Sequence, residues 1–188
     1  ELLPLQEDFS FDLDQYCGGL APDIEGVLLC NPNAPTGRLL PLKEVERILS
    51  SNEDKLIAAD EAYIDFGGET AAGIVNRYPN LIVTQTLSKS RQLAGMRVGL
   101  AIASKPLIAG LNAVKNSFNS YPIDRLAQVI GLASMEDSDY IQENAQKIIK
   151  TRMYTQKALK DLGFEMTDSK ANFIFVKHPH YDAQKLFQ

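Results

Sequence analysis

"NLIVTQTLSKSRQLAGMRVGLAIAS", residues 80–104, joins two apolar runs through a polar loop. The runs, 80–87 and 97–104, have the length and composition of buried strands, and "GVLLC" at 26–30 and "KLIAAD" at 55–60 give the same signal. None of the four alternates polar with apolar residues, and helical or irregular segments separate them. Such strands are typical of a parallel sheet with helices on both faces. The sequence therefore predicts an α/β fold with a mostly parallel sheet.

The loop in this stretch carries one lysine among hydrogen-bond donors. Lys89 is flanked by Ser88 and Ser90, Thr86 precedes them at the strand end, and Arg97 follows eight positions after the lysine. A lone lysine is most often a surface charge, but hydroxyls and an arginine beside it are donors suited to a phosphate. A lysine amine also forms a Schiff base with an aldehyde. Pyridoxal phosphate carries both groups, so the loop predicts a site for this cofactor.

A second loop, "DEAYIDF" at 60–66, adds an acid and a phenol at another strand end. Ligands of such sheets bind beyond the carboxyl ends of the strands, where Asp60 can keep the pyridine nitrogen of the cofactor protonated. Glu61 cannot, because successive side chains of a strand point in opposite directions. Tyr63 can offer its phenol to the ring oxygen. The alternatives are a strand-end cap for Asp60 and a structural role for Tyr63.

Composition narrows the function classes. The 188 residues are 45% hydrophobic and carry a net charge of −5, so no basic surplus suggests nucleic acid or an anionic membrane as a partner. Cys17 and Cys30 are too few for a disulfide scaffold, and Cys30 is most simply a small buried hydrophobe. No apolar run is long enough to span a membrane, and the first residues lack the pattern of a signal peptide. We expect a cytoplasmic protein that acts on small molecules.

The second half of the chain is mainly helical, with a long polar helix predicted from Asp137 to Leu162 and Gly163 as its stop. An apolar stripe indicates that this helix packs along another element. The stripe consists of Ile141, Ala145, Ile148, Leu159 and Leu162. Short strand-like segments follow. We divide the chain into a cofactor-binding large domain, residues 1–122, and a segment of linking helices that leads into a smaller α+β domain, residues 123–188; both are expected to be incomplete.

Four motifs in this order resemble the aminotransferases of fold type I, in class I/II, and among these the histidinol-phosphate aminotransferases. The motifs are "NPNAPTG", "ADEAYIDF", "TLSKSRQLAGMRVG" and "SFNSYPIDRLAQ". The resemblance implies a homodimeric transaminase of histidine biosynthesis that moves an amino group between histidinol phosphate and 2-oxoglutarate on pyridoxal 5'-phosphate. The resemblance implies three residues for both catalysis and cofactor binding: Lys89 as the Schiff-base lysine and proton shuttle, Asp60 as the partner of the pyridinium nitrogen, and Tyr63 as the partner of the ring hydroxyl. It also implies that Thr86, Ser88 and Arg97 bind the phosphate of the cofactor.

Two departures from the family pattern matter. Many members have an asparagine directly before Pro-Thr-Gly that contacts the ring hydroxyl, but this chain has Ala34 there, with Asn33 beside it. Whether Asn33 or only Tyr63 makes that contact is left open. The family also has an N-terminal stretch with further phosphate donors and a stacking aromatic ring, and a C-terminal stretch with a carboxylate-binding arginine. This chain resembles the central portion, so we expect the 188 residues alone to be inactive.

Other functions stay open at this point. A decarboxylase of a phosphorylated amino acid would use the same lysine and aspartate, and a non-catalytic scaffold fragment would keep the fold without the chemistry. "HPH" at 178–180 lacks the carboxylate or cysteine neighbours of a metal site and is expected to be an exposed loop. No nucleotide-binding glycine motif is present in the sequence.

Overall fold

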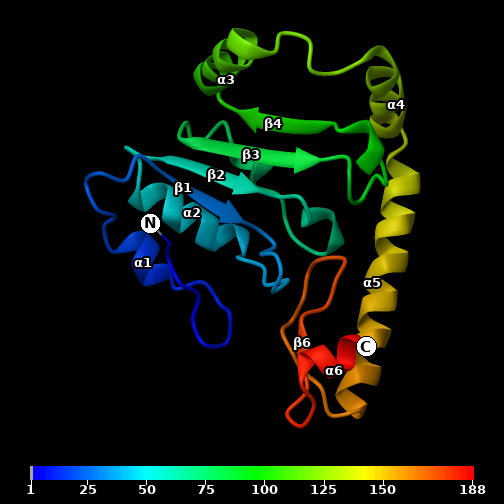
Figure 1. Ribbon diagram of the computed structural model, residues 1–188. Coiled ribbons are helices and arrows are strands. Elements are labelled where there is room, and N and C mark those ends of the chain that lie inside the picture. Colours follow the sequence, from blue (N-terminus) through cyan, green and yellow to red (C-terminus); the bar gives the residue numbers. More distant parts are fainter. Residues whose placement is uncertain (1) are drawn as a thin grey trace.

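The computed structural model describes residues 2–188. Its main sheet has four strands in the order β1 (Gly26–Cys30), β2 (Leu56–Asp60), β3 (Leu81–Thr86) and β4 (Gly99–Ala103) (Figure 1). β1, β2 and β3 are parallel, so their carboxyl ends lie at one edge of the sheet. The four strands and the mostly parallel sheet predicted from the sequence are confirmed.

β4 runs antiparallel to β3, with Thr86 opposite Gly99. The expectation of a parallel sheet is wrong for this last strand. A parallel neighbour needs a crossover connection, usually through a helix, whereas the segment between β3 and β4 contains only the short 3₁₀ helix η3 (Ala94–Met96). The chain therefore turns back, and the start of β4 lies beside the end of β3.

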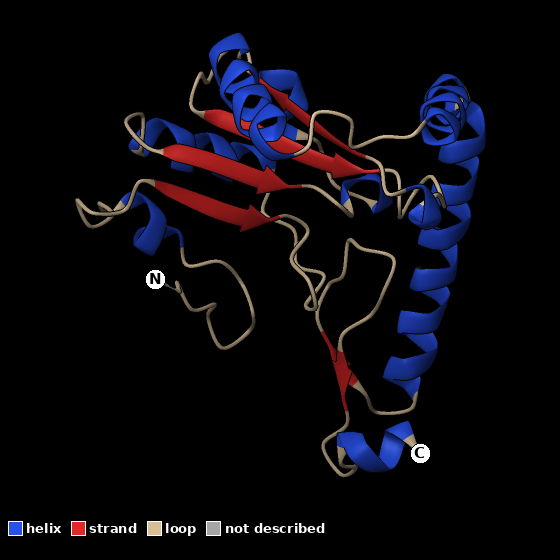
Figure 2. Cartoon of the chain, turned by 45° about the horizontal axis from the view of Figure 1, so that its top comes forward, coloured by secondary structure: helices blue, strands red, loops and turns tan. Residues whose placement is uncertain are grey.

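Helices surround this sheet and continue beyond it. Their bounds are α1 (Leu13–Cys17), α2 (Leu42–Ser51), η1 (Ile64–Phe66), η2 (Ala71–Ile74), α3 (Lys105–Phe118), α4 (Arg125–Glu136), α5 (Ser138–Asp161) and α6 (Ala183–Phe187). None of the helices within residues 2–188 is long and apolar enough to cross a membrane. Figure 2 shows the strands with helices on either side of them.

The main core lies between the sheet and α2. Ile48 and Leu49 of α2 are fully buried against Leu29 and Ile57 of the sheet. Burial alternates along β2, where Ile57 and Ala59 are buried while Leu56 and Asp60 are exposed. The side chains that face α2 therefore stabilise the sheet by packing in the core, and the side chains on the opposite face are available to contact a ligand or another surface.

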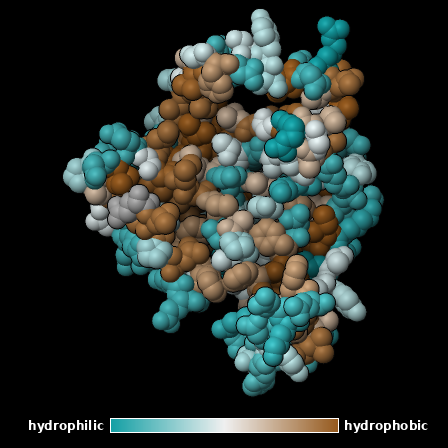
Figure 3. Space-filling view, in the orientation of Figure 1, coloured by the Kyte–Doolittle hydropathy of each residue, from teal (hydrophilic) through white to brown (hydrophobic). Residues whose placement is uncertain are grey.

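The face of β1 and β2 opposite α2, here called the open face, is only partly covered. Leu28 in the middle of β1 is 84% exposed on it. α3 packs beside β4, on the side away from α2 (Figures 1 and 2). The space-filling view shows an apolar patch over the region between α3 and the strands (Figure 3). Val114 and Phe118 are among the exposed apolar side chains of α3.

α5 leaves the main sheet and carries the chain to a small second sheet (Figure 1). Asp137 caps its N-terminus by accepting a hydrogen bond from the backbone N–H of Tyr140, and Gly163 follows its end with a φ of 86°. Ile141 and Ala145 are buried and Ile148 and Leu159 half-buried, but Leu162 is 68% exposed, so the predicted stripe is covered along the helix and not at its C-terminal end.

The second sheet pairs β5 (Glu165–Met166) with β6 (Val176–Lys177) in antiparallel orientation. Hydrogen bonds tie the segment between these strands to the loop after β1. Thr167 donates its hydroxyl to the carbonyl of Thr36, and the N–H of Lys170 donates to the carbonyl of Gly37 at 2.8 Å. The division of the chain at residue 122 stays a prediction.

Candidate functional site

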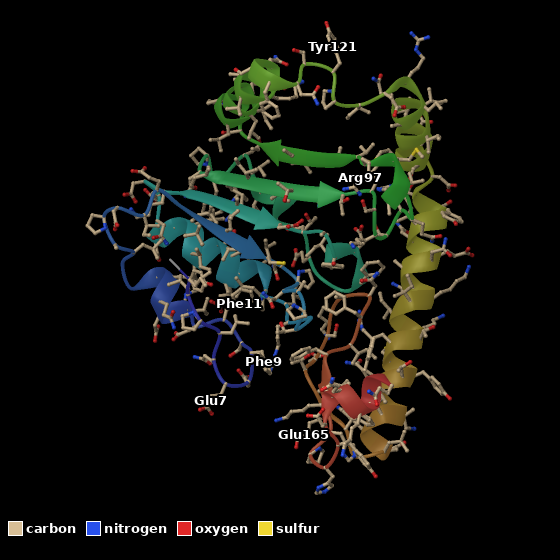
Figure 4. The ribbon with its side chains drawn as sticks, in the orientation of Figure 1. Glu7, Phe9, Phe11, Arg97, Tyr121 and Glu165 are labelled. Carbon is tan, nitrogen blue, oxygen red and sulfur yellow. The ribbon has the colours of Figure 1, made fainter. Side chains whose placement is uncertain are left out.

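The candidate site lies at the edge where β1, β2 and β3 end and β4 begins. Asp60 is the last residue of β2 and pairs with Thr84 of β3, while Thr86 is the last residue of β3. Arg97 lies beside the end of β3, because β4 returns there (Figure 4). The loops that were predicted to carry the chemistry, 31–37, 60–66 and 86–90, therefore meet at one edge.

Asp60 and Glu61 face opposite sides of the sheet, as the alternation of a strand requires. Asp60 is exposed on the side of the open face, and its Oδ1 accepts a hydrogen bond from the N–H of Ala62 at 3.1 Å. Glu61 is 2% exposed. The expectation that only Asp60 can face a ligand is consistent with this arrangement.

Glu61 is the centre of a buried hydrogen-bond network beneath the site. Its carboxylate accepts hydrogen bonds from the hydroxyl of Thr70, the N–H of Ala71 at 2.7 Å and Nε2 of Gln85 at 2.9 Å. These bonds join the end of β2 to η2 and β3. The role of Glu61 was not predicted from the sequence. The available signal was its position directly after a buried strand on the side that faces the core, where a carboxylate needs hydrogen-bond donors.

Tyr63 and Lys89 come together across two loops. Nζ of Lys89 lies 5.4 Å from the ring centroid of Tyr63, within the range of a cation–π contact. The phenol ring also packs edge-on against Phe173, with centroids 5.0 Å apart. Both side chains are half-buried. The structure thus places the predicted lysine and tyrosine next to each other and adds Phe173, which the sequence analysis did not single out.

Thr86 and Ser88 form a pair of hydroxyls at the end of β3. Oγ1 of Thr86 donates to Oγ of Ser88 at 2.9 Å and accepts from the N–H of Ser88 at 3.1 Å. Both hydroxyls are half-buried. The turn therefore presents hydroxyl and backbone donors together, which is the arrangement expected of a phosphate site.

Arg97 is exposed, and its Nη1 donates to the carbonyl of Ala94 at 3.1 Å. Its backbone has a φ of 55°, in the left-handed region that is uncommon for residues other than glycine. Such conformations gather at functional sites, where the surrounding structure holds them. Arg97 thereby lies just before the start of β4, which returns beside the end of β3.

A further hydrogen bond supports the loop after β3, residues 87–98, which is here called the lysine loop. Oγ of the buried Ser90 donates to Oδ2 of Asp65 in η1. This bond connects the loop after β3 with the loop after β2, next to Lys89. Ser90 was noted in the sequence as a hydroxyl near the lysine, but its partner is distant in sequence and could not be predicted.

The loop after β1 uses its asparagines internally. Asn33 accepts a hydrogen bond from the hydroxyl of Thr36 at 2.7 Å through its Oδ1, while Ala34 is exposed. Asn31 is buried and bonds both the N–H and the carbonyl of Leu40, at 2.8 and 2.9 Å. The Asn33 amide oxygen is therefore committed to its own loop, whereas its Nδ2 donates no side-chain hydrogen bond within residues 2–188, so Asn33 and Tyr63 both keep a donor for a ring hydroxyl.

The remaining candidates lie outside the site or at its margin. Cys30 is half-buried, and burial raises the pKa of its thiol above the ordinary value. His178 is half-buried, and its ring packs against Phe164 and Tyr181, while His180 is exposed. Within residues 2–188 no group of three or more His, Cys, Asp or Glu side chains is arranged to hold a metal ion.

Comparisons with known proteins agree on one family. A family model described as "Aminotransferase class I and II" matches residues 3–188. Histidinol-phosphate aminotransferase 1 of Methylococcus capsulatus is 53% identical over 186 residues, which cover 99% of this chain and 51% of that relative. The chain thus spans about half the length of the curated relatives it matches.

Solved structures show the same likeness. The histidinol-phosphate aminotransferase of Clostridium acetobutylicum matches with a TM-score of 0.88 and 26% identity, covering 97% of this chain and 56% of that one. That of Sinorhizobium meliloti in complex with pyridoxal-5'-phosphate matches with a TM-score of 0.82 and 25% identity, covering 94% and 48%. The chain belongs to the class I and II aminotransferases.

Proposed function

We propose that this chain forms part of a pyridoxal-phosphate-dependent aminotransferase and carries the groups that bind and activate the cofactor. The observation that carries the proposal is the meeting of Lys89, Tyr63 and Asp60 at the carboxyl edge of the sheet, beside the hydroxyl pair and Arg97. This edge is where open α/β sheets bind their ligands.

The donor set fits the chemical groups of the cofactor. An amine, a carboxylate and a phenol match its aldehyde, pyridine nitrogen and ring hydroxyl, while two hydroxyls and a guanidinium match its phosphate. Oδ2 of Asp60 accepts no hydrogen bond within residues 2–188, and Nη2 and Nε of Arg97 donate none there. Acceptor and donor capacity is therefore free on the groups that the cofactor would engage.

Each residue then has a distinct task. The bound cofactor supplies an electron sink that lets a proton leave the substrate carbon. Asp60 holds the proton on the pyridine nitrogen, which keeps that sink effective. Lys89 would hold the cofactor through its amine, and that amine could also accept and return a proton at the substrate carbon as a general base and acid. Tyr63 orients the ring, and Thr86, Ser88 and Arg97 bind the phosphate.

We further propose histidinol phosphate and 2-oxoglutarate as the substrates, because relatives named histidinol-phosphate aminotransferase are 52–53% identical to this chain over the aligned residues. We also expect a homodimer, and the exposed apolar side chains of α3 and α4 are consistent with further burial on assembly. Light scattering of the purified full-length protein measures its mass in solution, and a monomeric mass would contradict the dimer.

The test of the cofactor site is chemical labelling. Borohydride reduction of the full-length protein loaded with pyridoxal phosphate should fix the cofactor on the peptide that contains Lys89, and Lys89→Ala should abolish the label. Lys105→Ala and Lys115→Ala are matched controls that should retain it. A label on any other lysine would refute the assignment.

The test of the reaction is product analysis. With histidinol phosphate and 2-oxoglutarate, the full-length protein should form glutamate without releasing carbon dioxide. Carbon dioxide release from a phosphorylated amino acid would instead identify the decarboxylase predicted as an alternative. Labelling at Lys89 without either product would leave a cofactor-binding protein of another specificity.

A further inference from the structure

The apolar side of α5 contains one charged residue that is buried. Arg152 is 7% exposed and follows Ile148 by four positions, so it lies on the predicted apolar stripe of the helix. Burial lowers the pKa of its guanidinium, and the charge of Asp168 opposes this shift. A buried cation is unfavourable unless it is well bound, so its contacts require an explanation.

The contacts of Arg152 are with backbone carbonyls. Its Nη1 donates to the carbonyl of Phe66 at 2.8 Å and to the carbonyl of Ala171 at 2.6 Å. No ion pair includes Arg152 within the described part of the chain, and its buried Nε has no hydrogen-bond partner there. The guanidinium therefore serves to join two chain segments that are 105 residues apart.

The first of these segments leads directly to Tyr63. Phe66 is the last residue of η1, and its N–H donates back to the carbonyl of Tyr63 at 3.2 Å. The same short helix contains Asp65, which accepts the hydrogen bond from Ser90 next to Lys89. A displacement of η1 would therefore move both the phenol and the support of the lysine loop.

The second segment leads to the same phenol through Phe173. Ser169 donates its hydroxyl to the carbonyl of Phe173 at 2.6 Å and accepts from the N–H of Ala171 at 3.2 Å, which closes a turn around Ala171. Phe173, at the end of that turn, packs edge-on against the Tyr63 ring. Arg152 thus binds one carbonyl on each of the two segments that hold Tyr63.

We propose that Arg152 is a positioning residue of the active site, which sets the orientation of Tyr63 and, through Asp65 and Ser90, of Lys89. This inference rests on the proposed function, because it assumes that the cofactor binds at these two residues. Arg152 lies in the core beside η1 and acts only through the segments it joins. Its role is to keep η1 and the 169–173 turn at a fixed separation.

The guanidinium is needed for this role because of its reach and its donors. Both hydrogen bonds come from one nitrogen, Nη1, whose two N–H groups serve one carbonyl each. A lysine keeps the charge, but its ammonium nitrogen lies one bond closer to the backbone than Nη1, and a methionine keeps an apolar stem but removes all donors. The bonds of Thr167 to Thr36 and of Lys170 to Gly37 should remain in both variants, so the second segment stays tied to the loop after β1.

The experiment uses Arg152→Lys and Arg152→Met in the full-length protein loaded with pyridoxal phosphate. We measure the cofactor dissociation constant and the pH midpoint of the visible absorbance of bound cofactor. Both variants should weaken cofactor binding at least about tenfold, the loss expected for one hydrogen bond to a charged group. Both should also shift the pH midpoint in the direction that Tyr63→Phe shifts it.

Two controls separate positioning from general stability. Thr167→Val removes a side-chain hydrogen bond that ties the start of the second segment to the loop after β1 and not to η1, so it should lower stability while leaving the pH midpoint unchanged. In the Tyr63→Phe background, Arg152→Lys should cause no further shift, because its effect passes through the phenol. If Arg152→Met does not fold, Arg152→Lys alone and combined with Tyr63→Phe still tests whether Arg152 acts through the phenol.

Three results would overturn the inference. Folded Arg152 variants with an unchanged pH midpoint and dissociation constant would show that Arg152 is only structural. Additive shifts of Arg152→Lys and Tyr63→Phe would show that the two act independently. Absence of bound cofactor in the unmodified protein would refute the proposed function, and this inference with it.

Discussion

Asp60 ends β2 with its carboxylate exposed on the side of the open face, in register with Thr84. Asp60→Asn removes the charge at nearly constant shape. Turnover should fall about tenfold or more, because a hydrogen bond to a charged group contributes ~1.5–3 kcal/mol, while the amount of bound cofactor changes little. Steady-state kinetics and the absorbance of bound cofactor measure the two effects. Normal turnover in both Asp60→Asn and Asp60→Ala would mean that Asp60 is structural.

Cys30 gives a prediction on pH dependence at the margin of the site. Burial disfavours the charged thiolate and raises the thiol pKa, and the negative charge of Asp60 acts in the same direction. The thiolate is the reactive form, so alkylation of Cys30 should reach half its maximal rate at a higher pH than alkylation of free cysteine. Mass spectrometry of a Cys17→Ser variant treated with iodoacetamide measures this rate. A midpoint at or below that of free cysteine would contradict the prediction.

Single residues differ in how far the sequence determines them. The placement of Lys89, Asp60 and Tyr63 at one edge of the sheet could be predicted because each follows an apolar strand and the ends of parallel strands meet there, while their roles stay predictions. Arg152 had a visible signal, a cation on an apolar stripe, that was not used. Phe173 had none, because its contact with Tyr63 joins segments 110 residues apart in the chain.

The strand β2 and its continuation allow a paired test of two neighbouring acids. Glu61→Gln keeps the shape of the side chain but replaces a carboxylate oxygen with an amide group that faces the donors of Thr70, Ala71 and Gln85. The free energy of unfolding should fall by ~1.5–3 kcal/mol, because charge-assisted hydrogen bonds are lost in the core. Asp60→Asn is the matched variant on the opposite face and should leave stability nearly unchanged. Urea unfolding measures the free energy of unfolding of both variants. Equal losses of stability would contradict the prediction that Glu61 stabilises the core while Asp60 does not.

The loop after β1 depends on Gly37. Its φ is 72°, and a Cβ added there would lie less than 3 Å from Ser169, in van der Waals overlap with that side chain. Gly37→Ala should destabilise the protein by ~1–3 kcal/mol, since a residue with a Cβ is strained in this conformation. Gly73→Ala, where a Cβ meets no atom within 4 Å, is the control that should be neutral. Thermal unfolding compares the two, and a stable Gly37→Ala variant would rule out a tight contact with Ser169.

The elements themselves were largely predictable, since each strand is a short apolar run with loop residues after it. The direction of β4 was not, because an apolar run without alternation looks the same in either orientation. The absence of a helical pattern between Lys89 and Arg97 was the available signal. The length of α5 followed from Asp137 and Gly163 at its ends, whereas the exposure of Leu162 depends on what packs against the helix and could not be predicted from its spacing.

On the scale of the whole molecule, the N-terminal segment joins regions that are far apart in the chain. Arg38 donates to both the backbone and the carboxylate of Asp8, and Phe9 packs edge-on against Phe175 with centroids 5.2 Å apart. In Figure 4, Phe9 lies between the N-terminal loop and the second sheet. The segment therefore connects the loop after β1 with the strand region of the second sheet.

Phe9→Ala tests this connection. The variant should lose ~0.5–1.5 kcal/mol beyond the loss of buried area, because edge-to-face aromatic pairs contribute about that amount. Hydrogen exchange should also become faster at Gln6 and Phe9, whose N–H groups are bonded within the segment. Leu2→Ala, at a fully exposed position, is the control. Unchanged exchange at both positions would show that the segment holds its shape without Phe175.

The return of β4 beside β3 also defines an exchangeable unit for protein engineering. The N–H of Leu87 donates to the carbonyl of Val98, which closes the loop 88–97 directly above the pair Thr86 and Gly99. Lys89, Ser88 and Arg97 all lie within this closed loop, so these three groups can be transplanted as one block between related proteins that keep Thr86 at the end of β3. The register of β3 and β4 would be kept in such a chimera, because the hydrogen bonds that fix it lie outside the exchanged residues.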